Sequence, residues 1–441
     1  MHADILINAR WVIPVEPDGV VLDHHSVALE DGRIVAILPT SEASEQIQAD
    51  QTVDREQHAL IPGLINAHGH SPMTLMRGLA DDLPLMEWLD QHIWPAEARW
   101  VGEEYVQDGS QLAVAEMLAG GTTAFNDMYF FPEITARVSS AAGIRCCAGM
   151  IVIDFPSAWA GNSEDYIAKG IAMHDQFRND PLVTTAFAPH APYSVSRPVL
   201  ERVRTLADEL DVPVHIHLHE TEHEISEHVA KHGMRPLADL SQIGLLSPSL
   251  VAVHMTQMND NEIETFAESG GHIVHCPESN MKLASGFARV ADWLSAGINV
   301  GLGTDGAASN NDLDMFSEMR SAAMLGKAVA ADASAVPAAA TLRMATLNGA
   351  ACLGLQAETG SLEVGKAADI VAISLADARC QPVYHPISQL VYTCSADQVT
   401  DTWVNARHLY SSGQLTTLNV TDLVTRAQSW AERINAADSA D

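Results

Sequence analysis

The sequence has few cysteines and few basic residues, and each shortage excludes a class of protein. Its 6 cysteines form no Cys-x-x-Cys pair and no dense framework, so we expect buried, reduced thiols rather than a disulfide scaffold. Lysine and arginine number 24 against 57 acidic residues, a net charge of −33. Because nucleic acids and anionic membranes bind basic patches, the charge argues against both as partners.

Long apolar runs are also missing. No run reaches the roughly 20 residues that a membrane helix needs, and residues 1–7 show no basic stretch followed by an apolar core. We therefore expect a cytoplasmic protein that has no membrane partner. The chain has 441 residues, of which 47% are hydrophobic, enough for a large domain with an accessory one.

Short strand-like pieces at both chain ends predict a small β domain. Residues 26–30 and 33–38 flank Asp31-Gly32, a hairpin signal. Residues 402–410 are a further strand candidate near the other end. We predict that residues 1–60 and 360–420 pair into one antiparallel β-sandwich domain. Residues 421–441 should form a C-terminal helix and tail.

Between the ends, apolar runs alternate with helical stretches. This alternation predicts an α/β fold, a closed (β/α)8 TIM-like barrel over residues 61–359. Active-site residues of such barrels lie at the carboxyl ends of the strands. The expected strands are 60–65, 122–126, 144–153, 183–188, 212–218, 250–254, 272–275 and 298–303.

Polar residues cluster where several of these runs end. His68 and His70 follow the first run and, two residues apart, would face one point. Neutral imidazole is a common ligand of zinc and similar metals. Alone, the pair is equally compatible with two polar residues at a strand end.

Later strand ends supply further candidates. His215, His217 and His219 alternate along one run, and strand spacing does not decide which of them would bind a metal. His254 ends the next strand, and Asp305 follows the last. Because buried ionisable groups are costly unless they are paired or metal-bound, the set favours a functional site over packing.

Seven pieces spread over nearly the whole chain carry a resemblance to a known family. They are Pro62-Gly-Leu-Ile-Asn-Ala-His-Gly-His70, Pro189-His-Ala-Pro-Tyr-Ser-Val-Ser196, His217-Leu-His-Glu220-Thr221, His254, His275-Cys-Pro-Glu-Ser-Asn-Met-Lys-Leu-Ala-Ser-Gly286, Gly303-Thr-Asp305-Gly-Ala-Ala-Ser-Asn310 and Gly360-Ser-Leu-Glu-Val-Gly-Lys-Ala-Ala-Asp369. The chain resembles the amidohydrolase superfamily, and more closely its branch of 5′-methylthioadenosine/S-adenosylhomocysteine deaminases and triazine hydrolases.

The resemblance implies a set of metal ligands. In the family a ligand stands three residues before a catalytic glutamate, which selects His217 with Glu220. The implied ligands are then His68, His70, His217 and Asp305. Such donors suit one Zn²⁺ per subunit, with Fe²⁺ as the alternative. Some relatives bridge two metals through a modified lysine, but no lysine lies between Lys169 and Lys231, so we expect a mononuclear site.

Hydrolytic chemistry follows from these residues. A bound divalent metal lowers the pKa of water from 15.7 toward about 7. We expect Asp305 to take the proton of the water and His254 to orient the resulting nucleophile. Protonated Glu220 would donate to the ring nitrogen beside the attacked carbon, as a non-ligand glutamate does in zinc nucleobase deaminases. Asp305 would then protonate the departing ammonia.

The segment 71–97, rich in Met and Trp, is expected either to pack on the barrel or to wall the substrate pocket, with Met76 and Trp88 as contacts. By resemblance, Glu97 and His190 match ribose contacts of the nucleoside deaminases. Alternatively, Glu97 is an exposed helix-start carboxylate, and His190 is a core histidine.

These assignments predict deamination of an adenosine-type nucleoside, with a purine nucleoside as the small-molecule partner. The preferred compounds are 5′-methylthioadenosine, S-adenosylhomocysteine or adenosine. The alternatives are another N-heterocycle (guanine, 8-oxoguanine or a triazine) and, in a different class, a non-catalytic barrel scaffold. The fold alone does not separate them. Self-association into a homo-oligomer is a further expectation from the resemblance.

Overall fold

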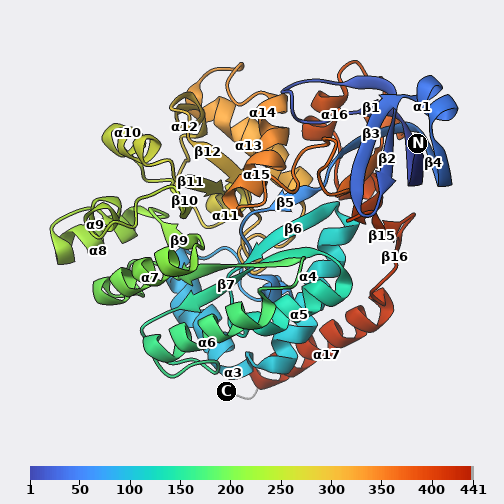
Figure 1. The fold of residues 1–441 in the computed structure, drawn as a ribbon. Coiled ribbons are helices and arrows are strands. Elements are labelled where there is room, and N and C mark those ends of the chain that lie inside the picture. The colour runs from blue at the N-terminus through green and yellow to red at the C-terminus, as the bar shows by residue number, and fades with distance from the viewer. Residues whose placement is uncertain (439–441) are drawn as a thin grey trace.

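Eight parallel strands in chain order form the barrel sheet of this computed structural model, which describes residues 1–438 (Figure 1). Seven of the eight predicted barrel strands are found with bounds that differ by a few residues, and the first begins only at Leu64. The strands are β5 (Leu64–Asn66), β6 (Thr122–Asp127), β7 (Arg145–Val152), β8 (Val183–Pro189), β9 (Val214–Leu218), β10 (Leu250–His254), β11 (His272–His275) and β12 (Asn299–Leu302).

The first and last barrel strands meet at their carboxyl ends. Ala67 N donates to Leu302 O at 2.8 Å, and Asp305 N donates to His68 O at 3.0 Å. Gly69 and Asp305 also form an isolated parallel bridge. This seam brings residues far apart in sequence to one end of the barrel.

The predicted strand 60–65 is corrected, because it spans two sheets. Residues 60–62 end β4 (Gln48–Pro62) and pair with β13 (Ile370–Ser374), whereas β5 begins at Leu64. The break falls at Gly63, where an added Cβ would lie 1.8 Å from Thr123 Oγ1. Only glycine fits at this close approach. The break there allows the apolar run 60–65 to contribute strands to both sheets.

The second sheet combines both chain ends in the order β16-β15-β14-β13-β4-β1-β2-β3. Its remaining strands are β1 (His2–Val12), β2 (Leu22–Glu30), β3 (Arg33–Pro39), β14 (Val399–Val404), β15 (Arg407–Ser411) and β16 (Gln414–Leu415). The predicted hairpin at Asp31-Gly32 joins β2 and β3.

The expectation of a purely antiparallel unit is wrong, because β1 and β4 pair in parallel. Helix α1 (Thr40–Gln46) carries the chain across the sheet between β3 and β4, so β4 runs in the same direction as β1. The predicted fold class, a barrel with a small β domain made from both ends, is confirmed. The division at residues 60 and 360 stays a prediction.

Helices cover the outside of the barrel (Figure 1). The helices after α1 are α2 (Leu85–Trp88), α3 (Trp94–Trp100), α4 (Glu103–Ala119), α5 (Pro132–Ala142), α6 (Ser163–Phe177), α7 (Arg197–Leu210), α8 (Glu222–His232), α9 (Pro236–Gln242), α10 (Asp260–Ser269), α11 (Pro277–Lys282), α12 (Val290–Ser295), α13 (Met315–Ala330), α14 (Ala338–Met344), α15 (Leu347–Cys352), α16 (Pro386–Tyr392) and α17 (Val420–Asp438).

The predicted C-terminal helix is α17, which packs on α4. Its Trp430 Nε1 donates to Asp108 Oδ2 at 2.9 Å, and Arg426 pairs with the same carboxylate. The end of the predicted tail, residues 439–441, lies outside the described residues. Within the described part, none of the helices has the length and apolarity to cross a membrane. All six cysteines are buried and free, as expected.

Candidate metal centre and active site

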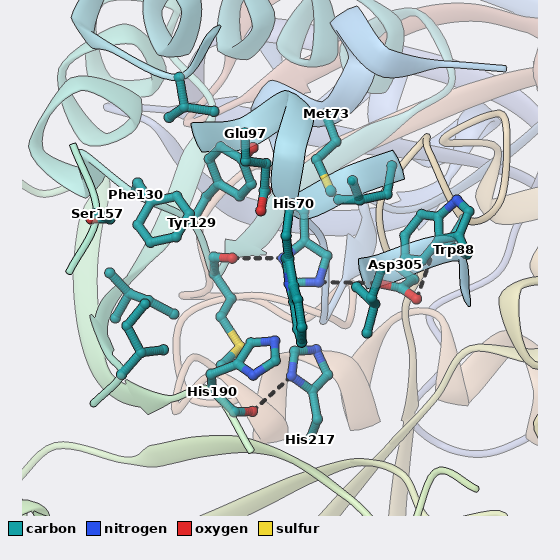
Figure 2. Close-up of a pocket in the computed structure, with 18 of the residues that line it drawn as sticks. His70, Met73, Trp88, Glu97, Tyr129, Phe130, Ser157, His190, His217 and Asp305 are labelled. Atoms are coloured by element: carbon teal, nitrogen blue, oxygen red, sulfur yellow. Dashed lines mark hydrogen bonds and ion pairs between the residues drawn. The ribbon is translucent and has the colours of Figure 1, made fainter. Parts of the chain in front are cut away.

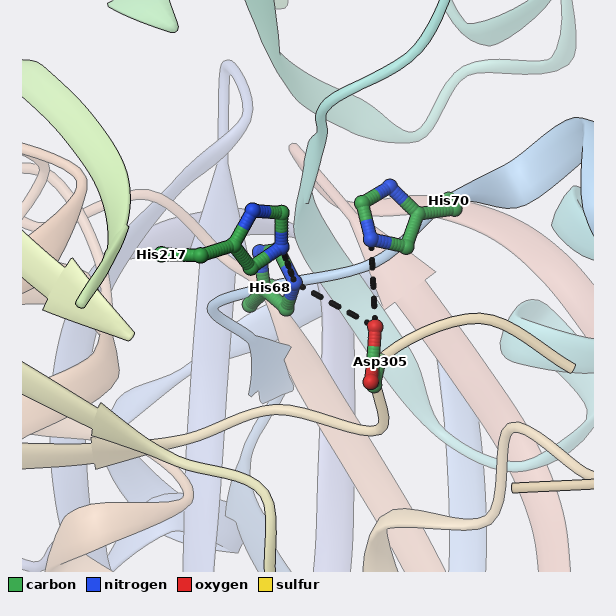
Figure 3. A group of neighbouring side chains, drawn as sticks. All are labelled: His68, His70, His217 and Asp305. Atoms are coloured by element: carbon green, nitrogen blue, oxygen red, sulfur yellow. Dashed lines mark hydrogen bonds and ion pairs between the residues drawn. The ribbon is translucent and has the colours of Figure 1, made fainter. Parts of the chain in front are cut away.

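Four side chains meet at the barrel end where β5 and β12 join (Figure 3). His68, His70, His217 and Asp305 each offer one ligand atom, and these atoms lie within 4.8 Å of one another. The Nε2 atoms of His217 and His68 are 3.1 Å apart. Asp305 Oδ1 lies 3.1 Å from His70 Nε2 and 3.4 Å from His68 Nε2. The structure thus brings together the four residues that the resemblance implied.

The hydrogen bonds of the outer ring nitrogens decide what the inner ones offer. His70 Nδ1 lies 2.6 Å from Met128 O, and His217 Nδ1 lies 2.8 Å from His190 O. Because a carbonyl oxygen only accepts, each Nδ1 must carry the proton. Each Nε2 therefore presents a lone pair to the centre of the cluster, as a metal ligand must.

The charges of the cluster also suit a cation. Burial lowers the pKa of His68 to about 4 and holds that of His217 well below its ordinary value, so both rings are neutral. His70 differs: burial lowers its pKa, but the hydrogen bond to Asp305 and the charge of that carboxylate, together with Met128 O and Asp127, raise it above its ordinary value. A cation at the centre would take the place of the proton that His70 shares with Asp305.

Asp305 is held as an ionised carboxylate. Burial raises its pKa, but His68 and His70 lower it further, to a value well below the ordinary range. Its Oδ2 accepts from Ser279 Oγ at 2.6 Å and from Ser309 Oγ at 3.0 Å. Three imidazoles and one oriented carboxylate are a donor set that fits Zn²⁺.

The three alternating histidines have different partners in the structure. His217 points to the cluster, and His215 Nε2 lies 2.9 Å from His68 Nδ1, outside it. His219 does not continue the alternation of His215 and His217. His219 lies beyond the end of β9 with φ of 53°, which turns its side chain away. Its Nε2 accepts from Leu237 N at 3.0 Å, in the first turn of α9.

Glu220 and His254 lie next to the cluster. His254 Nε2 is 3.8 Å from Glu220 Oε2, and its Nδ1 is 2.8 Å from Asn280 Oδ1. Ser285 Oγ donates to Glu220 Oε1 at 3.1 Å. Burial raises the pKa of Glu220, with Asp305 adding to the effect. A carboxyl that holds a proton beside an oriented imidazole can deliver that proton to a bound molecule.

Several supporting residues escaped the sequence reasoning. Glu224 accepts from the backbone N–H of His219 at 3.0 Å and of Glu220 at 2.7 Å, and so fixes the turn that aims Glu220. Ser279, Asn280 and Ser285 all lie in the 275–286 segment, whose polar residues were a usable signal. For Glu224, the usable signal was its place as a carboxylate in the first turn of α8.

A cavity of about 390 Å³ opens above the cluster (Figure 2). Glu97, His190 and Trp88 all line it, and Glu220, His254 and Asp305 reach it from the barrel end. Burial raises the pKa of Glu97 to about 7, against the lowering effect of Tyr129 and His70. His190 Nδ1 lies 2.8 Å from Ser194 Oγ, and burial lowers the His190 pKa to about 3.

Met76, predicted as a contact, is not among the residues that line the cavity. Met76 is 2% exposed and belongs to the hydrophobic core, whereas Met73 lines the cavity. Both lie in a 3₁₀ helix, Ser71–Met76, and Met76 stands one turn, about 6 Å, farther from His70. Tyr129 was missed: it follows β6, lies beside Glu97 (Figure 2) and lines the cavity. Its position just past a barrel strand was the available signal.

Comparisons with known proteins agree with this geometry. A model of the amidohydrolase family matches residues 59–409. The 5-methylthioadenosine/S-adenosylhomocysteine deaminase of Saccharophagus degradans is 47% identical over 98% of this chain and 97% of its own. A crystal structure of an adenosine deaminase from Xanthomonas campestris with bound zinc superposes with a TM-score of 0.98, at 52% identity and 99% coverage of both chains.

A more distant solved structure shows the fold alone. Atrazine chlorohydrolase from Arthrobacter aurescens, complexed with zinc, superposes with a TM-score of 0.89 at 24% identity. It covers 97% of this chain and 99% of its own. The shared architecture therefore extends to proteins with other substrates.

Proposed function

The chain belongs to the amidohydrolase family, and we propose that it is a zinc-dependent deaminase of adenosine-type nucleosides. It is a hydrolase of the kind that acts on C–N bonds of cyclic amidines. The proposed substrates are 5′-methylthioadenosine, S-adenosylhomocysteine or both, and adenosine; the products are the inosine derivative and ammonia. The observation that carries the proposal is the buried Glu220–His254 pair beside the His3Asp cluster, at the floor of the cavity.

In the proposed mechanism, His68, His70, His217 and Asp305 hold one divalent ion. When bound, such an ion lowers the pKa of water to about 7 and so makes hydrolysis feasible at neutral pH. Asp305 receives the proton of the attacking water, since its carboxylate is ionised and faces the cluster. His254 orients that water through Nε2, because its Nδ1 is engaged by Asn280.

Glu220 supplies the proton on the substrate side. Attack at a carbon of the purine ring places electron density on the adjacent ring nitrogen, which must be protonated. Burial raises the pKa of the Glu220 carboxyl and so favours its protonated form, and Ser285 together with the turn held by Glu224 fixes its direction. Asp305 then returns its proton to the leaving amine, and ammonia departs. The hydroxyl on the attacked carbon becomes the carbonyl of the product as its proton returns to Glu220.

Glu97 and His190 are proposed to bind the ribose. Glu97 faces the cavity from α3, on the side opposite His217 (Figure 2). Its carboxylate can accept from two sugar hydroxyls at once. His190 carries the backbone carbonyl that orients His217, so the same residue connects the proposed sugar contact to the cluster.

The Glu220→Gln variant tests the proposal. Its kcat for nucleoside deamination should fall by roughly 10²–10⁴ because the proton donor is lost, with metal content unchanged. Glu222→Gln, at an exposed position in the first turn of α8, is the matched control and should keep full activity. Near-normal turnover of metal-loaded Glu220→Gln would contradict the proton-donor role.

A substrate panel separates the function from its alternatives. Ammonia release is measured with 5′-methylthioadenosine, S-adenosylhomocysteine, adenosine, guanine, 8-oxoguanine and a triazine. The proposal expects release from the adenosine nucleosides. Release from guanine or a triazine alone would contradict it, and a metal-free, inactive protein would indicate the scaffold alternative.

A further inference from the structure

The wall of the cavity is polar at one end and apolar at the other. At the barrel end it carries three members of the cluster, His70, His217 and Asp305, together with Glu220 and His254. Away from the cluster, the wall is formed by side chains from residues 89–93, from α3 and from the segment after β7, where Ser157 is a polar member of the lining. Those that matter here are Ile93, Trp94, Ile153, Phe155, Pro156 and Ala158.

Among residues 1–438, which the structure describes, the cavity lining contains neither arginine nor lysine. The lysine adjacent to Leu283, a lining residue, is Lys282, and it pairs with Asp81 at 2.6 Å. Lys169 donates to Trp159 O and pairs with Asp165 at 3.3 Å. The acidic side chains that line the cavity are Glu97, Glu220 and Asp305.

The proposed function orients a nucleoside in this cavity. The purine amino carbon must reach the cluster and Glu220, and the ribose must reach Glu97 and His190. The 5′ substituent is then the part of the ligand left to face the remaining wall. That wall ends at a rim where Trp94 and Phe155 lie 6.3 Å apart, measured between ring centroids, and Phe155 is 43% exposed.

We propose that the cavity selects adenosine nucleosides with a neutral, apolar 5′ substituent, such as an alkylthioether, over those whose 5′ chain ends in a carboxylate. The inference rests on the proposed function and deepens it. An alkylthio group gains from burial among aromatic and aliphatic side chains. A carboxylate in the same place loses water, finds no cationic partner and lies in a cavity that already contains three carboxyl groups.

The test compares two 5′ chains of equal length. 5′-Butylthioadenosine and S-adenosylhomocysteine share the thioether and four carbons, and only the second ends in a carboxylate and an ammonium. We expect kcat/KM for the butylthio compound to be within about tenfold of that for 5′-methylthioadenosine, and to exceed that for S-adenosylhomocysteine by at least about 100-fold. Values for the two long chains within threefold of each other would overturn the proposal.

A variant at the rim tests whether the lack of a cation causes the selectivity against a terminal carboxylate. Phe155→Arg places a cation at a partly exposed position and should raise kcat/KM for S-adenosylhomocysteine, relative to the butylthio compound, by about tenfold. Phe155→Met, the neutral control, should leave that ratio unchanged. Deamination of both long-chain nucleosides at equal rates overturns only the selectivity. Deamination of no nucleoside overturns the proposed function itself.

Discussion

The three histidines of the cluster turn Nε2 inward because each Nδ1 has a partner outside it. For His70 and His217 that partner is a backbone carbonyl, which fixes the tautomer. For His68 the partner is another imidazole, Nε2 of buried His215, at 2.9 Å. An imidazole nitrogen can donate or accept, so the tautomer of His68 depends on that of His215. Of the residues outside the cluster, His215 is therefore the one whose replacement should weaken metal binding most.

Replacement of His215 tests this dependence. His215→Leu removes the acceptor and should weaken Zn²⁺ binding by about 10–100-fold. His215→Gln keeps an amide oxygen that accepts from His68 and should bind Zn²⁺ within a few-fold of the wild type. Affinity is measured by competition with a chromogenic chelator, independently of activity. Equal affinities of the two variants would show that the hydrogen bond is immaterial.

A second prediction at the scale of residues concerns the Glu97 carboxylate. Glu97→Ala should raise KM for the nucleosides by about 10–100-fold, the loss of one hydrogen bond to a charged group, and should leave KM for free adenine unchanged. Steady-state assays on both compounds check this. Glu87→Ala, at an exposed position in α2 of the same segment, is the control. An equal loss on adenine would refute a ribose contact.

At the scale of elements, one buried carboxylate connects three strands of the terminal sheet. Asp401 of β14 accepts from Arg55 of β4 through two bonds of 2.6 Å each and lies 2.9 Å from His408 Nε2 of β15. Its side chain is fully buried. Burial raises the Asp401 pKa, but His408 and Arg55 lower it more, and the net shift is strongly downward.

Asp401 should therefore make stability depend on pH. A lowered folded-state pKa contributes stability above the unfolded value of about 3.9 and loses it as pH falls below that value. Asp401→Asn should lower the free energy of unfolding by about 3–5 kcal/mol at pH 7, with a smaller difference below about pH 4. Urea denaturation at the two pH values measures this. Exposed Asp397→Asn should change little, and a deficit that does not depend on pH would contradict the assignment.

At the scale of the whole molecule, the cluster lies across the seam that closes the barrel. His68 and His70 follow the first barrel strand and Asp305 follows the last, and the two segments are joined there by few backbone hydrogen bonds. An ion held by both segments would connect the beginning of the barrel to its end. Binding would then stabilise the fold as well as serve the reaction.

Removal of the metal should lower the melting temperature by several degrees, and added Zn²⁺ should restore it. The expected stabilisation is about 2.7 kcal/mol at 100 times the dissociation constant. Differential scanning calorimetry with and without a chelator measures the change. His68→Ala should show no response to Zn²⁺. A melting temperature that does not change on chelation would contradict a metal across the seam.

Much of the architecture was predictable because it depends on local pattern. Runs of apolar residues determined the barrel strands, and Asp31-Gly32 determined a hairpin. The direction of β4 was not predictable, since it depends on a crossover through α1 rather than on the residues of the strand. The split at Gly63 was hidden because both halves of the run are apolar, and only the contact with Thr123 reveals it.

For this protein, the sequence by itself determined the family, the barrel and the candidates for the cluster, because each is encoded in short segments that can be read one at a time. The tertiary structure decided which of these segments contact one another. It assigned different partners to His215, His217 and His219, placed Met73 rather than Met76 in the cavity wall and, among the described residues, left that wall without arginine or lysine. Those outcomes depend on which distant segments meet at the barrel end, and spacing along the chain does not specify this.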